Sequence, residues 1–504
     1  MNADVAPGLR TKNTSPTTFE SRSPADGTLV GCCTVSTEQD VGSVVDTARR
    51  AFEAWSSLPV ASRSRHLRQW RAEIWSRRAE FAELIHRETG KPLEDALLEV
   101  VLTLEHIAWN EKNAARLLQT RRVRPGLLLA NSRARIDRVP LGVVGVIGPW
   151  NYPLYTANGA VSAALAAGNT VVLKPSEHTP GVAVLYAQAF AAANPGIQVG
   201  VLSVVTGFGD TGVALCESGV DKIAFTGSTA TGTAVMERCA RTLTPVVLEC
   251  GGKDPVIVAA DADIAAAARA VAWGAFTNAG QTCVGVERVY VDEAVAPAFT
   301  AELVRHARRA EPGMGRKATY GPMTMPAQID VVRRHVDAAL AAGGRALFGG
   351  PSSIGSAVIG PIVLTDVPEN NDAIREETFG PTVTVTTVSN VDDAVRRAND
   401  HQYALGASVF SRRHGDAIAR QLSCGQVTVN SVIAFAGMGS VPMGGLRASG
   451  FGRVHGEEGF YEFCRTRSRV EKRWLLPGFD LTTLKRRPWI SPVLDRVLGL
   501  RHRS

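Results

Sequence analysis

The sequence predicts an α/β protein built from two doubly wound open sheets. Short apolar strands alternate with helices from about residue 141 onward, a pattern typical of parallel sheets with helical crossovers. One alternating series covers residues 141–248, and a second begins at residue 255. A region with apolar residues at helical spacing, residues 41–118, precedes both series. Two such sheets side by side place a ligand cleft where their strand ends face each other.

The expected strands and helices follow this alternation along the chain. Residues 1–40 predict a polar lead-in with short strands, and residues 123–140 a short basic strand-like segment. In the first series we expect strands at 141–147, 170–173, 201–205, 222–225 and 246–248, and helices at 157–167, 182–193, 211–218 and 231–242. In the second we expect strands at 255–258, 289–291, 382–388, 407–410 and 426–429, and helices at 264–276, 294–309, 329–342, 391–399 and 416–422.

Composition narrows the class of protein. With 504 residues, 45% of them apolar and 20% charged, the chain has the make-up of a soluble globular protein of two or three domains. The eight cysteines form no CxxC pair and no cysteine–histidine metal spacing, so we expect reduced thiols and no metal site. Residues 1–23 lack an apolar signal core, and no apolar run reaches a membrane-spanning length. These features predict a cytoplasmic protein.

The net charge of +7 is concentrated at the C-terminus. Residues 465–504 hold eleven lysines and arginines against three acids, so the first 464 residues carry a net charge of −1. We expect no nucleic-acid binding, because this short basic tail contains neither a reading motif nor an interleaved aromatic stacking platform.

Residues 276–283 attach one cysteine to the end of a helical run. The run 264–276 is followed by small, turn-prone residues that end in Cys283. A thiol attacks only as the thiolate, and its ordinary pKa is about 8.5. A catalytic Cys283 therefore needs a base and a site for the developing negative charge. Taken alone, the residue is more readily explained as a buried, inert thiol.

Three strand ends of the first series resemble phosphate and ribose sites. Gly207 and Gly209 match G-x-G-x-x-G between a strand and a helix, although the acid expected about 20 residues later is absent. Residues 225–232 place small residues at a helix start, where free N–H groups and the helix dipole favour an anion. Lys174 and Glu177 end another strand, where they can bind ribose hydroxyls. Any one of these is also compatible with a ligand-free turn or an exposed ion pair, but two loops on one sheet favour a dinucleotide.

Seven short motifs follow one another along the chain. They read Pro-Trp-Asn-Tyr-Pro, Lys-Pro-Ser-Glu, a loop of small residues, Leu-Glu-Cys-Gly-Gly-Lys, Asn-Ala-Gly-Gln-Thr-Cys, Glu-Glu-Thr-Phe-Gly-Pro and Pro-Met-Gly-Gly. They occupy residues 149–153, 174–177, 225–232, 248–253, 278–283, 376–381 and 442–445. In this order they resemble the motifs of the NAD(P)-dependent aldehyde dehydrogenase superfamily, over about residues 20–475. The resemblance implies cofactor and catalytic domains, both doubly wound, plus a small oligomerisation β-extension.

The resemblance also implies a reaction, the oxidation of an aldehyde to a carboxylic acid. Cys283 is expected to attack the aldehyde carbon, giving a thiohemiacetal and, after hydride loss, a thioester. The oxyanion is expected to lie against the Asn151 side-chain amide and the Cys283 backbone N–H. Glu249 is the expected base that activates water for thioester hydrolysis, and Lys174 is placed in the same catalytic set. The alternatives are a CoA-acylating relative and a non-catalytic protein on the same fold.

A second set of residues is implied to bind the cofactor. Glu177 favours NAD because its carboxylate repels the 2′-phosphate of NADP, while the neighbouring Lys174 keeps NADP open as a second choice. We expect Glu377 at the nicotinamide-side ribose and Phe379 near the nicotinamide. The predicted cofactor residues are Ile147, Pro149, Trp150, Lys174, Ser176, Glu177, Gly207, Gly209, Phe225, Gly227, Ser228, Gly232, Cys250, Glu377 and Phe379.

The same resemblance divides the chain into domains. Residues 1–122 and 141–249, with a return at 448–466, are predicted to form the dinucleotide-binding domain, and residues 250–447 the catalytic domain. Residues 123–140 and 467–476 are expected to form the oligomerisation segment of a homodimer or homotetramer.

Residues 477–504 predict a basic amphipathic tail. Ser491-Pro492 resembles a helix start, and Val493, Leu494, Val497 and Leu498 share one helical face among cations. Such a tail is expected either to make peripheral contact with an anionic membrane or to pack on a neighbouring subunit. The motifs leave the aldehyde open between a semialdehyde and an apolar, long-chain or aromatic one.

Overall fold

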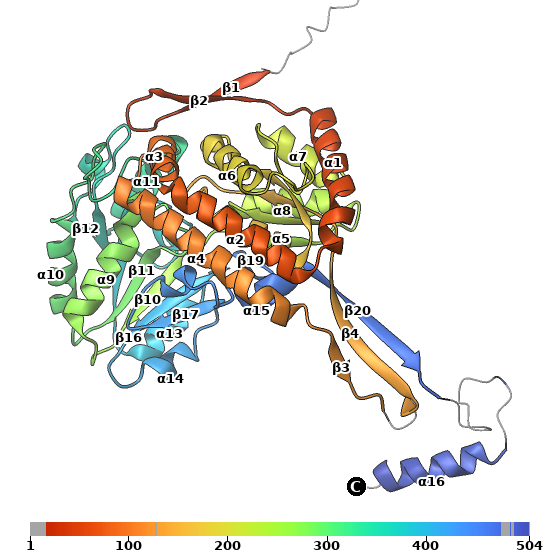
Figure 1. Ribbon diagram of the computed structural model, residues 1–504. Helices are drawn as coiled ribbons and strands as arrows, with labels where there is room; N and C mark the ends of the chain where they lie inside the picture. The colour runs from red at the N-terminus through yellow and green to blue at the C-terminus, as the bar shows by residue number, and fades with distance from the viewer. Residues whose placement is uncertain (1–16, 127–128, 475–483, 485–487, 503–504) are drawn as a thin grey trace, which may run out of the picture.

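The computed structural model describes residues 17–126, 129–474, 484 and 488–502. Two α/β units lie side by side, and a narrow β arm with a separate C-terminal helix extends away from them (Figure 1). Each unit is built on one open sheet. The predicted fold class, two doubly wound sheets with a small β extension, is confirmed.

The first sheet has six strands in the order β19-β9-β8-β5-β6-β7, all parallel except β19. The chain runs outward from β5 in one direction and then returns to β8 on its other side. This reversal is a topological switch point, where the strand ends leave a crevice for a ligand. The strands are β5 (Val143–Ile147), β6 (Thr170–Lys174), β7 (Leu202–Val204), β8 (Lys222–Thr226), β9 (Val246–Glu249) and β19 (Gly450–Phe451). The helices packed on them are α1 (Glu38–Ser57), α5 (Tyr155–Ala167), α6 (Pro180–Ala193), α7 (Gly209–Glu217) and α8 (Thr229–Ala240).

The second sheet has seven strands in the order β12-β13-β14-β11-β10-β16-β17, and only β12 is antiparallel to its neighbour. Two of these strands, β12 and β13, were not predicted. The strands are β10 (Asp254–Val258), β11 (Val286–Asp292), β12 (Arg345–Phe348), β13 (Ile362–Thr365), β14 (Thr382–Val388), β16 (Gly406–Phe410) and β17 (Gln426–Val429). The helices of this unit are α9 (Ile264–Phe276), α10 (Ala296–Ala307), α11 (Ala327–Ala341), α12 (Asp372–Arg375), α13 (Val391–Asn399) and α14 (Gly415–Ala419).

Three long helices cover the first unit and supply much of its core. They are α2 (Val60–Ser76), α3 (Arg78–Thr89) and α4 (Leu93–Leu117). Their apolar residues recur at helical spacing, so one face is buried, and Trp70, Ile74 and Phe81 are fully enclosed in the core cluster with α5 and α6. Helix α4 packs along α5, which begins directly after the loop between β5 and α5. This layer therefore lies close to the carboxyl end of β5.

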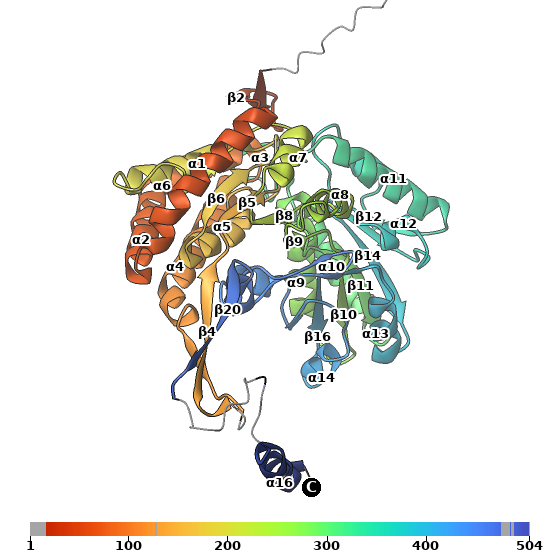
Figure 2. The same cartoon turned by 90° about the vertical axis from the view of Figure 1, so that its right-hand side faces the viewer.

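The arm is a three-stranded antiparallel sheet in the order β20-β4-β3 that extends from the first unit (Figure 2). Its strands are β3 (Arg121–Val123), β4 (Ser132–Pro140) and β20 (Cys464–Lys472). Helix α16 (Ile490–His502) lies beyond the arm, away from both units. None of the helices in the described part of the chain is long and apolar enough to cross a membrane. The remaining elements are β1 (Thr18–Arg22), β2 (Leu29–Thr34), β15 (Tyr403–Ala404), β18 (Leu446–Arg447), α15 (Gly456–Tyr461) and the 3-10 turns Thr277–Gly280, Pro351–Ser353 and Ala434–Gly437.

Candidate active site

The loop before Cys283 has an unusual backbone. Helix α9 is capped by Asp263, whose carboxylate accepts from Ala266 N, and the helix ends at Phe276. The next turn contains Asn278, Ala279 and Gly280 at φ angles of 51°, 57° and 71°. Left-handed conformations at non-glycine residues store strain and cluster at functional sites. A loop of this kind persists only where the surrounding structure holds it.

Side-chain hydrogen bonds hold this strained turn. Asn278 Nδ2 donates to Gln281 O (3.2 Å), and Gln281 Nε2 donates back to Asn278 O (2.8 Å). Thr324 N donates to Gln281 Oε1 (2.8 Å), which ties the turn to a neighbouring loop. A side chain at Gly280 would overlap the carbonyl oxygen of Gly380, so only glycine fits there. The position of Cys283 is therefore set by bonds within the turn and by close backbone packing.

Cys283 is half-buried against apolar side chains. It packs on a small cluster with Val284, Leu405 and Phe435. Burial raises the pKa of the Cys283 thiol far above its usual range, and nearby carboxyl groups, Glu377 first, raise it further. The resting thiol is therefore neutral, and an attack on substrate requires a group that removes its proton.

The loop after β5 brings Asn151 to the Cys283 turn. Asn151 Nδ2 donates to Gln281 O (2.9 Å), two residues before the cysteine. Next to it, Tyr152 Oη and Thr282 Oγ1 lie 3.0 Å apart. A primary amide has two N–H donors. One anchors Asn151 to the turn, and the second has no acceptor among the described residues, so it is available to an oxyanion.

Glu249 ends β9 in a dry environment. Its side chain is buried, and neither carboxylate oxygen has a hydrogen-bond partner in the described part of the chain. Burial raises the pKa of Glu249 well above its ordinary value, against a smaller opposing effect from Arg453. A buried carboxyl group without partners is destabilising, so its presence calls for a functional explanation. Lys253, four residues later in the chain, does not neutralise Glu249, because it forms its ion pair with Glu287.

A cavity of about 800 Å³ opens at the carboxyl ends of β5, β6 and β8, around the switch point. It also touches the starts of α7 and α8. Ten predicted cofactor residues line it: Ile147, Pro149, Trp150, Lys174, Ser176, Glu177, Gly209, Phe225, Gly227 and Ser228. Five predicted residues do not line it: Gly207, Gly232, Cys250, Glu377 and Phe379.

The cavity fits a dinucleotide at three points. Ser228 caps α8 by accepting from Thr231 N (3.2 Å), and the dipole of this helix favours an anion at its start. The start of α7 is open, since a side chain at Gly209 would meet nothing within 4 Å. Lys174 Nζ lies 3.9 Å from Glu177 Oε2, and burial lowers the pKa of this lysine. The Lys174 ammonium and the Glu177 carboxylate therefore both lie at the cavity, as expected for side chains that bind ribose hydroxyls.

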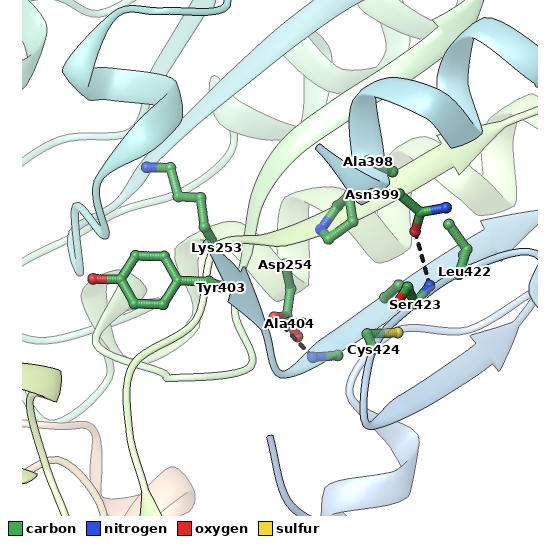
Figure 3. Close-up of a pocket in the computed structure, with 12 residues that line it drawn as sticks. Lys253, Asp254, Ala398, Asn399, Tyr403, Ala404, Leu422, Ser423 and Cys424 are labelled. Carbon is green, nitrogen blue, oxygen red and sulfur yellow. Dashed lines mark hydrogen bonds between the residues drawn. The ribbon is translucent and has the colours of Figure 1, made fainter. Parts of the chain in front are cut away.

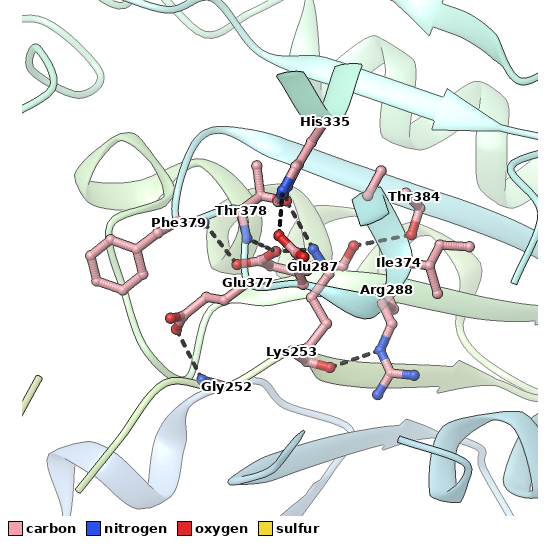
Figure 4. A network of polar contacts seen from close by, with 12 residues as sticks. Gly252, Lys253, Glu287, Arg288, His335, Ile374, Glu377, Thr378, Phe379 and Thr384 are labelled. Atoms are coloured by element: carbon pink, nitrogen blue, oxygen red, sulfur yellow. Dashed lines mark hydrogen bonds and ion pairs between the residues drawn. The ribbon is translucent and has the colours of Figure 1, made fainter. Parts of the chain in front are cut away.

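The segment 377–379 of the second unit belongs to a network of polar contacts around Lys253 and Glu287 (Figure 4), and it touches one residue of the cavity wall. The Phe379 ring packs edge-on against Trp150, with ring centroids 5.5 Å apart. Glu377 accepts from Gly252 N (2.9 Å), and burial raises the pKa of Glu377 to about 8. Glu287, which no motif predicted, accepts from Thr378 N (2.9 Å) and Phe379 N (3.1 Å).

The other predicted residues outside the cavity pack behind it. A side chain at Gly232 would crowd Cys250 Sγ, so these two residues lie together beneath the start of α8. Gly207 lies against Thr211 and not at the cavity wall. G-x-G-x-x-G therefore marks a tight strand–helix turn in this chain, with Gly209 and Gly212 at the cavity and Gly207 behind it.

A second, much smaller pocket lies between β10 and the loop before β17 (Figure 3). Its volume of about 10 Å³ has room for a single water molecule at most. Asp254 there accepts from Gly406 N (3.0 Å), and burial raises the pKa of this carboxyl to about 7. Across the described residues, no group of three His, Cys, Asp or Glu is arranged to hold a metal ion.

A cavity of about 800 Å³ at the switch point of the first sheet, with the Cys283 turn hydrogen-bonded to the loop on its wall, is the architecture expected of a nucleotide-dependent α/β enzyme. A model of the aldehyde dehydrogenase family matches residues 11–469. The chain is 39% identical over 465 residues to 4,4'-diapolycopene aldehyde oxidase of a Methylomonas species, covering 92% of this chain and 87% of that protein. It therefore belongs to the aldehyde dehydrogenase family.

Two further similar proteins also have names of aldehyde or semialdehyde dehydrogenases. One, provisionally named succinate-semialdehyde dehydrogenase (NADP+), comes from Mycolicibacterium smegmatis and is 38% identical over 453 residues, or 88% of this chain and 86% of that protein. The crystal structure of an NAD-dependent aldehyde dehydrogenase from Sinorhizobium meliloti superposes with a TM-score of 0.87 at 34% identity, covering 96% of this chain and 94% of that one. The predicted resemblance and the predicted enzyme class are confirmed.

Proposed function

We propose that the protein oxidises an aldehyde to a carboxylic acid with NAD(P)+, using Cys283 as the nucleophile. The observation that carries this proposal is the buried, unpaired carboxyl group of Glu249, which raises the pKa of Cys283 after burial, Glu377 and Asp254. A proton acceptor without a partner, close to a neutral thiol, is the arrangement that thiol activation requires.

The proposed sequence of steps uses three side chains. Glu249 takes the Cys283 proton, and the sulfur forms a bond to the aldehyde carbon. The oxyanion of the thiohemiacetal lies against the free N–H of Asn151 and the Cys283 N–H. Bound NAD(P)+ supplies the hydride acceptor. Glu249 then releases this proton to solvent, and its carboxylate removes a proton from the water that attacks the thioester carbon. The C–S bond breaks, the carboxylic acid leaves, and the Cys283 sulfur takes a proton back to restore the thiol.

The cofactor contacts are assigned by position in the cavity. The start of α8 is proposed to bind the pyrophosphate, and Lys174 and Glu177 the adenine-side ribose. Lys174 contributes to catalysis in this proposal by holding the cofactor. Glu377 and Phe379 are proposed to contact the nicotinamide half from the second unit. Cys250 and Gly232 support the start of α8 from behind.

NAD is the proposed first choice of cofactor, because the Glu177 carboxylate at the cavity repels a 2′-phosphate. Glu177→Ser removes this repulsion while keeping a small polar side chain. We expect the ratio of kcat/KM with NAD to kcat/KM with NADP to fall by about tenfold. An unchanged ratio would contradict the assignment of Glu177.

The proposed substrate is an uncharged, apolar aldehyde. The cluster that packs on Cys283 is apolar, with Ile433, Val441 and Met443 packed against its buried members. A distal carboxylate on a semialdehyde would be desolvated there and would face the carboxyl groups that raise the pKa of Cys283. The apolar part of an uncharged aldehyde carries no charge to desolvate and is not repelled by these carboxyl groups.

One assay tests the function. NADH formation is measured with short, aromatic, long-chain and semialdehyde substrates, with and without CoA, for the wild type and Cys283→Ala. We expect CoA-independent turnover that Cys283→Ala lowers by at least about 1000-fold. A strict requirement for CoA would support an acylating enzyme, and wild-type activity in Cys283→Ala would exclude the mechanism. No turnover with any aldehyde, despite NAD binding, would favour a non-catalytic protein.

The domain boundaries are proposed as the sequence predicted them. The return of residues 448–466 to the cofactor unit is supported by β19, which pairs with β9 in the first sheet. We also propose a homo-oligomer. Both outer strands of the arm, β20 and β3, have no further strand beside them in the described chain, and Val470 on β20 is largely exposed. Unpaired strand edges pair readily with another copy.

We propose that α16 contacts an anionic membrane surface. The helix lies apart from both units. Trp489 and Val493, in or directly before the helix, and Trp474 at the end of the arm are exposed. Apolar anchors among cations are typical of interfacial segments. The helix begins at Ile490, two residues before the predicted proline start. The side chain of Val497 and residues 485–487, part of the predicted tail, lie outside the described residues.

A further inference from the structure

Lys91 and Glu99 form a buried ion pair in the helical layer of the first unit. Lys91 precedes α4, and Glu99 lies on its second turn. Lys91 Nζ and Glu99 Oε2 are 2.7 Å apart, and both side chains are 1% exposed. A buried pair offsets its desolvation only when its remaining donors and acceptors are also bonded. The partners of those remaining atoms all belong to the loop that carries Asn151.

Lys91 binds the backbone of Asn151 directly. Its Nζ donates to Asn151 O (2.8 Å) and lies 4.1 Å from the centre of the Tyr152 ring. A hydrogen bond from a charged donor is about twice as strong as a neutral one. The lysine therefore fixes both the carbonyl of Asn151 and the neighbouring aromatic ring.

Glu99 binds the other end of the same loop. Its Oε1 accepts from Leu154 N (2.9 Å) and Tyr155 N (3.2 Å), at the start of α5. Helix α5 has no side-chain cap from its own N-cap residue, so Glu99 satisfies donors that would otherwise be buried without a partner. Its charge is also favourable at a helix N-terminus.

The loop meets the Cys283 turn from the opposite side. Asn278 Nδ2 donates to Asn151 O (3.1 Å), while Asn151 Nδ2 donates to Gln281 O (2.9 Å). The Asn151 carbonyl thus lies between Lys91 and Asn278. Because Asn151 is held at its carbonyl and at one amide N–H, the direction of its second N–H is set.

We propose that Lys91 and Glu99 are positioning residues for the oxyanion donor Asn151, acting as one unit that carries no net charge. The inference rests on the proposed function, because it assumes that Asn151 contacts the developing oxyanion. The physical basis is that a donor stabilises a transition state only when it is already oriented, and a displacement of about 1 Å can cost about 100-fold in rate.

The test replaces the whole pair. Removing one partner would leave a buried charge and risk unfolding, whereas replacing both by apolar residues of similar size is often neutral for stability. For Lys91→Met/Glu99→Leu we expect a folded protein whose Tm falls moderately, because Leu154 N and Tyr155 N lose their acceptor. We expect kcat to fall by about 10- to 100-fold, and the NAD dissociation constant from fluorescence titration to change less than about twofold.

A double-mutant cycle with Asn151→Ala separates positioning from general destabilisation. In the Asn151→Ala background, the pair replacement should cost less than about threefold, since the group it positions is gone. An equal loss in both backgrounds would overturn this inference alone. Full activity of Asn151→Ala by itself would instead overturn the oxyanion role in the proposed function.

A matched control uses another buried carboxylate on the same helix. Glu111 accepts ion pairs from Arg68 (2.6 Å) and Arg71 (3.2 Å) in the helical layer. Glu111→Gln should lower the Tm but leave kcat within about twofold. A loss of kcat matching that of the Lys91/Glu99 variant would overturn the proposal. A crystal structure of that variant decides the question without turnover: a displaced Asn151 amide supports positioning, and an unmoved one contradicts it.

Discussion

The side chain of Glu249 is the clearest case in which a single residue is kept at a cost to stability. Its carboxyl group is buried at a strand end, and both oxygens lack partners within the described residues. The backbone around it is well bonded, because β9 pairs with β8 on one side and with β19 on the other. The fold therefore holds the carboxyl group rigidly in a dry position, where its pKa is raised and its basicity toward a thiol or a water is increased.

Glu249→Gln should separate activity from stability. We expect kcat to fall by at least about 100-fold, because an amide is no base. Glu249 acts as a base only in its ionised fraction, which grows as pH rises. In the wild type, burial raises the folded-state pKa of Glu249, so between the two pKa values the folded form keeps a proton that the unfolded form loses. Wild-type stability is thus lost as pH rises from about 4.5 toward the raised pKa. Glutamine does not titrate, so the Tm of the variant minus that of the wild type should grow between pH 5 and pH 8.

Glu88 offers a control for this experiment. It is also buried, and burial raises the pKa of Glu88 to about 7, but it bonds Ser21 and the start of α6, away from Cys283. Glu88→Gln should change the pH dependence of the Tm while kcat stays within about twofold of wild type. If Glu249→Gln turned over aldehyde at the wild-type rate, Glu249 would not be the base.

At the scale of elements, the turn between α9 and Cys283 decides where the nucleophile lies. Three consecutive left-handed residues bring the chain back from the helix end, and the Gln281 side chain bonds both to the turn itself and to the neighbouring loop at Thr324. Gly280 packs directly on the backbone at Gly380, next to the segment that carries Phe379. Because this contact is between backbone atoms, no flexible side chain can move aside to relieve a steric overlap.

Gly280→Ala should therefore be severe. The new side chain would overlap the Gly380 carbonyl and would also require a left-handed alanine, so we expect a loss of about 2–4 kcal/mol in the free energy of unfolding. Denaturant titration measures this loss, and activity should fall at least tenfold because the turn carries Cys283. Gly196→Ala is the matched control, since a side chain there meets nothing within 4 Å and its φ is negative. Equal stabilities for the two variants would contradict the packing argument.

At the scale of the whole molecule, the arm and α16 extend away from the two units that contain the site. Removal of α16 should leave the cavity and the Cys283 turn intact, because both are built from residues before 464 and α16 lies apart from them. This arrangement lets the tail be tested without disturbing the chemistry.

A truncation after Trp474 should abolish binding to anionic vesicles and leave kcat with a water-soluble aldehyde within about twofold. Binding of the full-length protein should weaken at high salt, because cationic residues near the tail attract anionic lipid. Co-sedimentation with vesicles of phosphatidylserine and phosphatidylcholine measures this, with phosphatidylcholine alone as the control. Light scattering of the truncated protein tests the alternative that the tail packs on a neighbouring subunit. A smaller oligomer with unchanged vesicle binding would support this alternative.

Much of the fold was predictable because its signals are local. Helix α9 begins and ends at the predicted residues, since Asp263 caps it and an apolar face runs through it. The edge strand β12 was missed because its first residues are exposed, so it lacks the apolar pattern of a buried strand. Strand β13 was missed with it, after a stretch of glycine and serine that predicts a loop.

The sequence by itself determined the strand–helix order, the caps and the residue types of each motif, because these depend on neighbours a few positions away. Only the tertiary structure decided which charges meet. Lys253 pairs with Glu287 and leaves Glu249 alone, and Lys91 reaches Asn151 across 60 positions of sequence. The pKa values of Cys283 and Glu249 were likewise outside the reach of any motif. Burial sets them, and burial depends on side chains from every part of the fold.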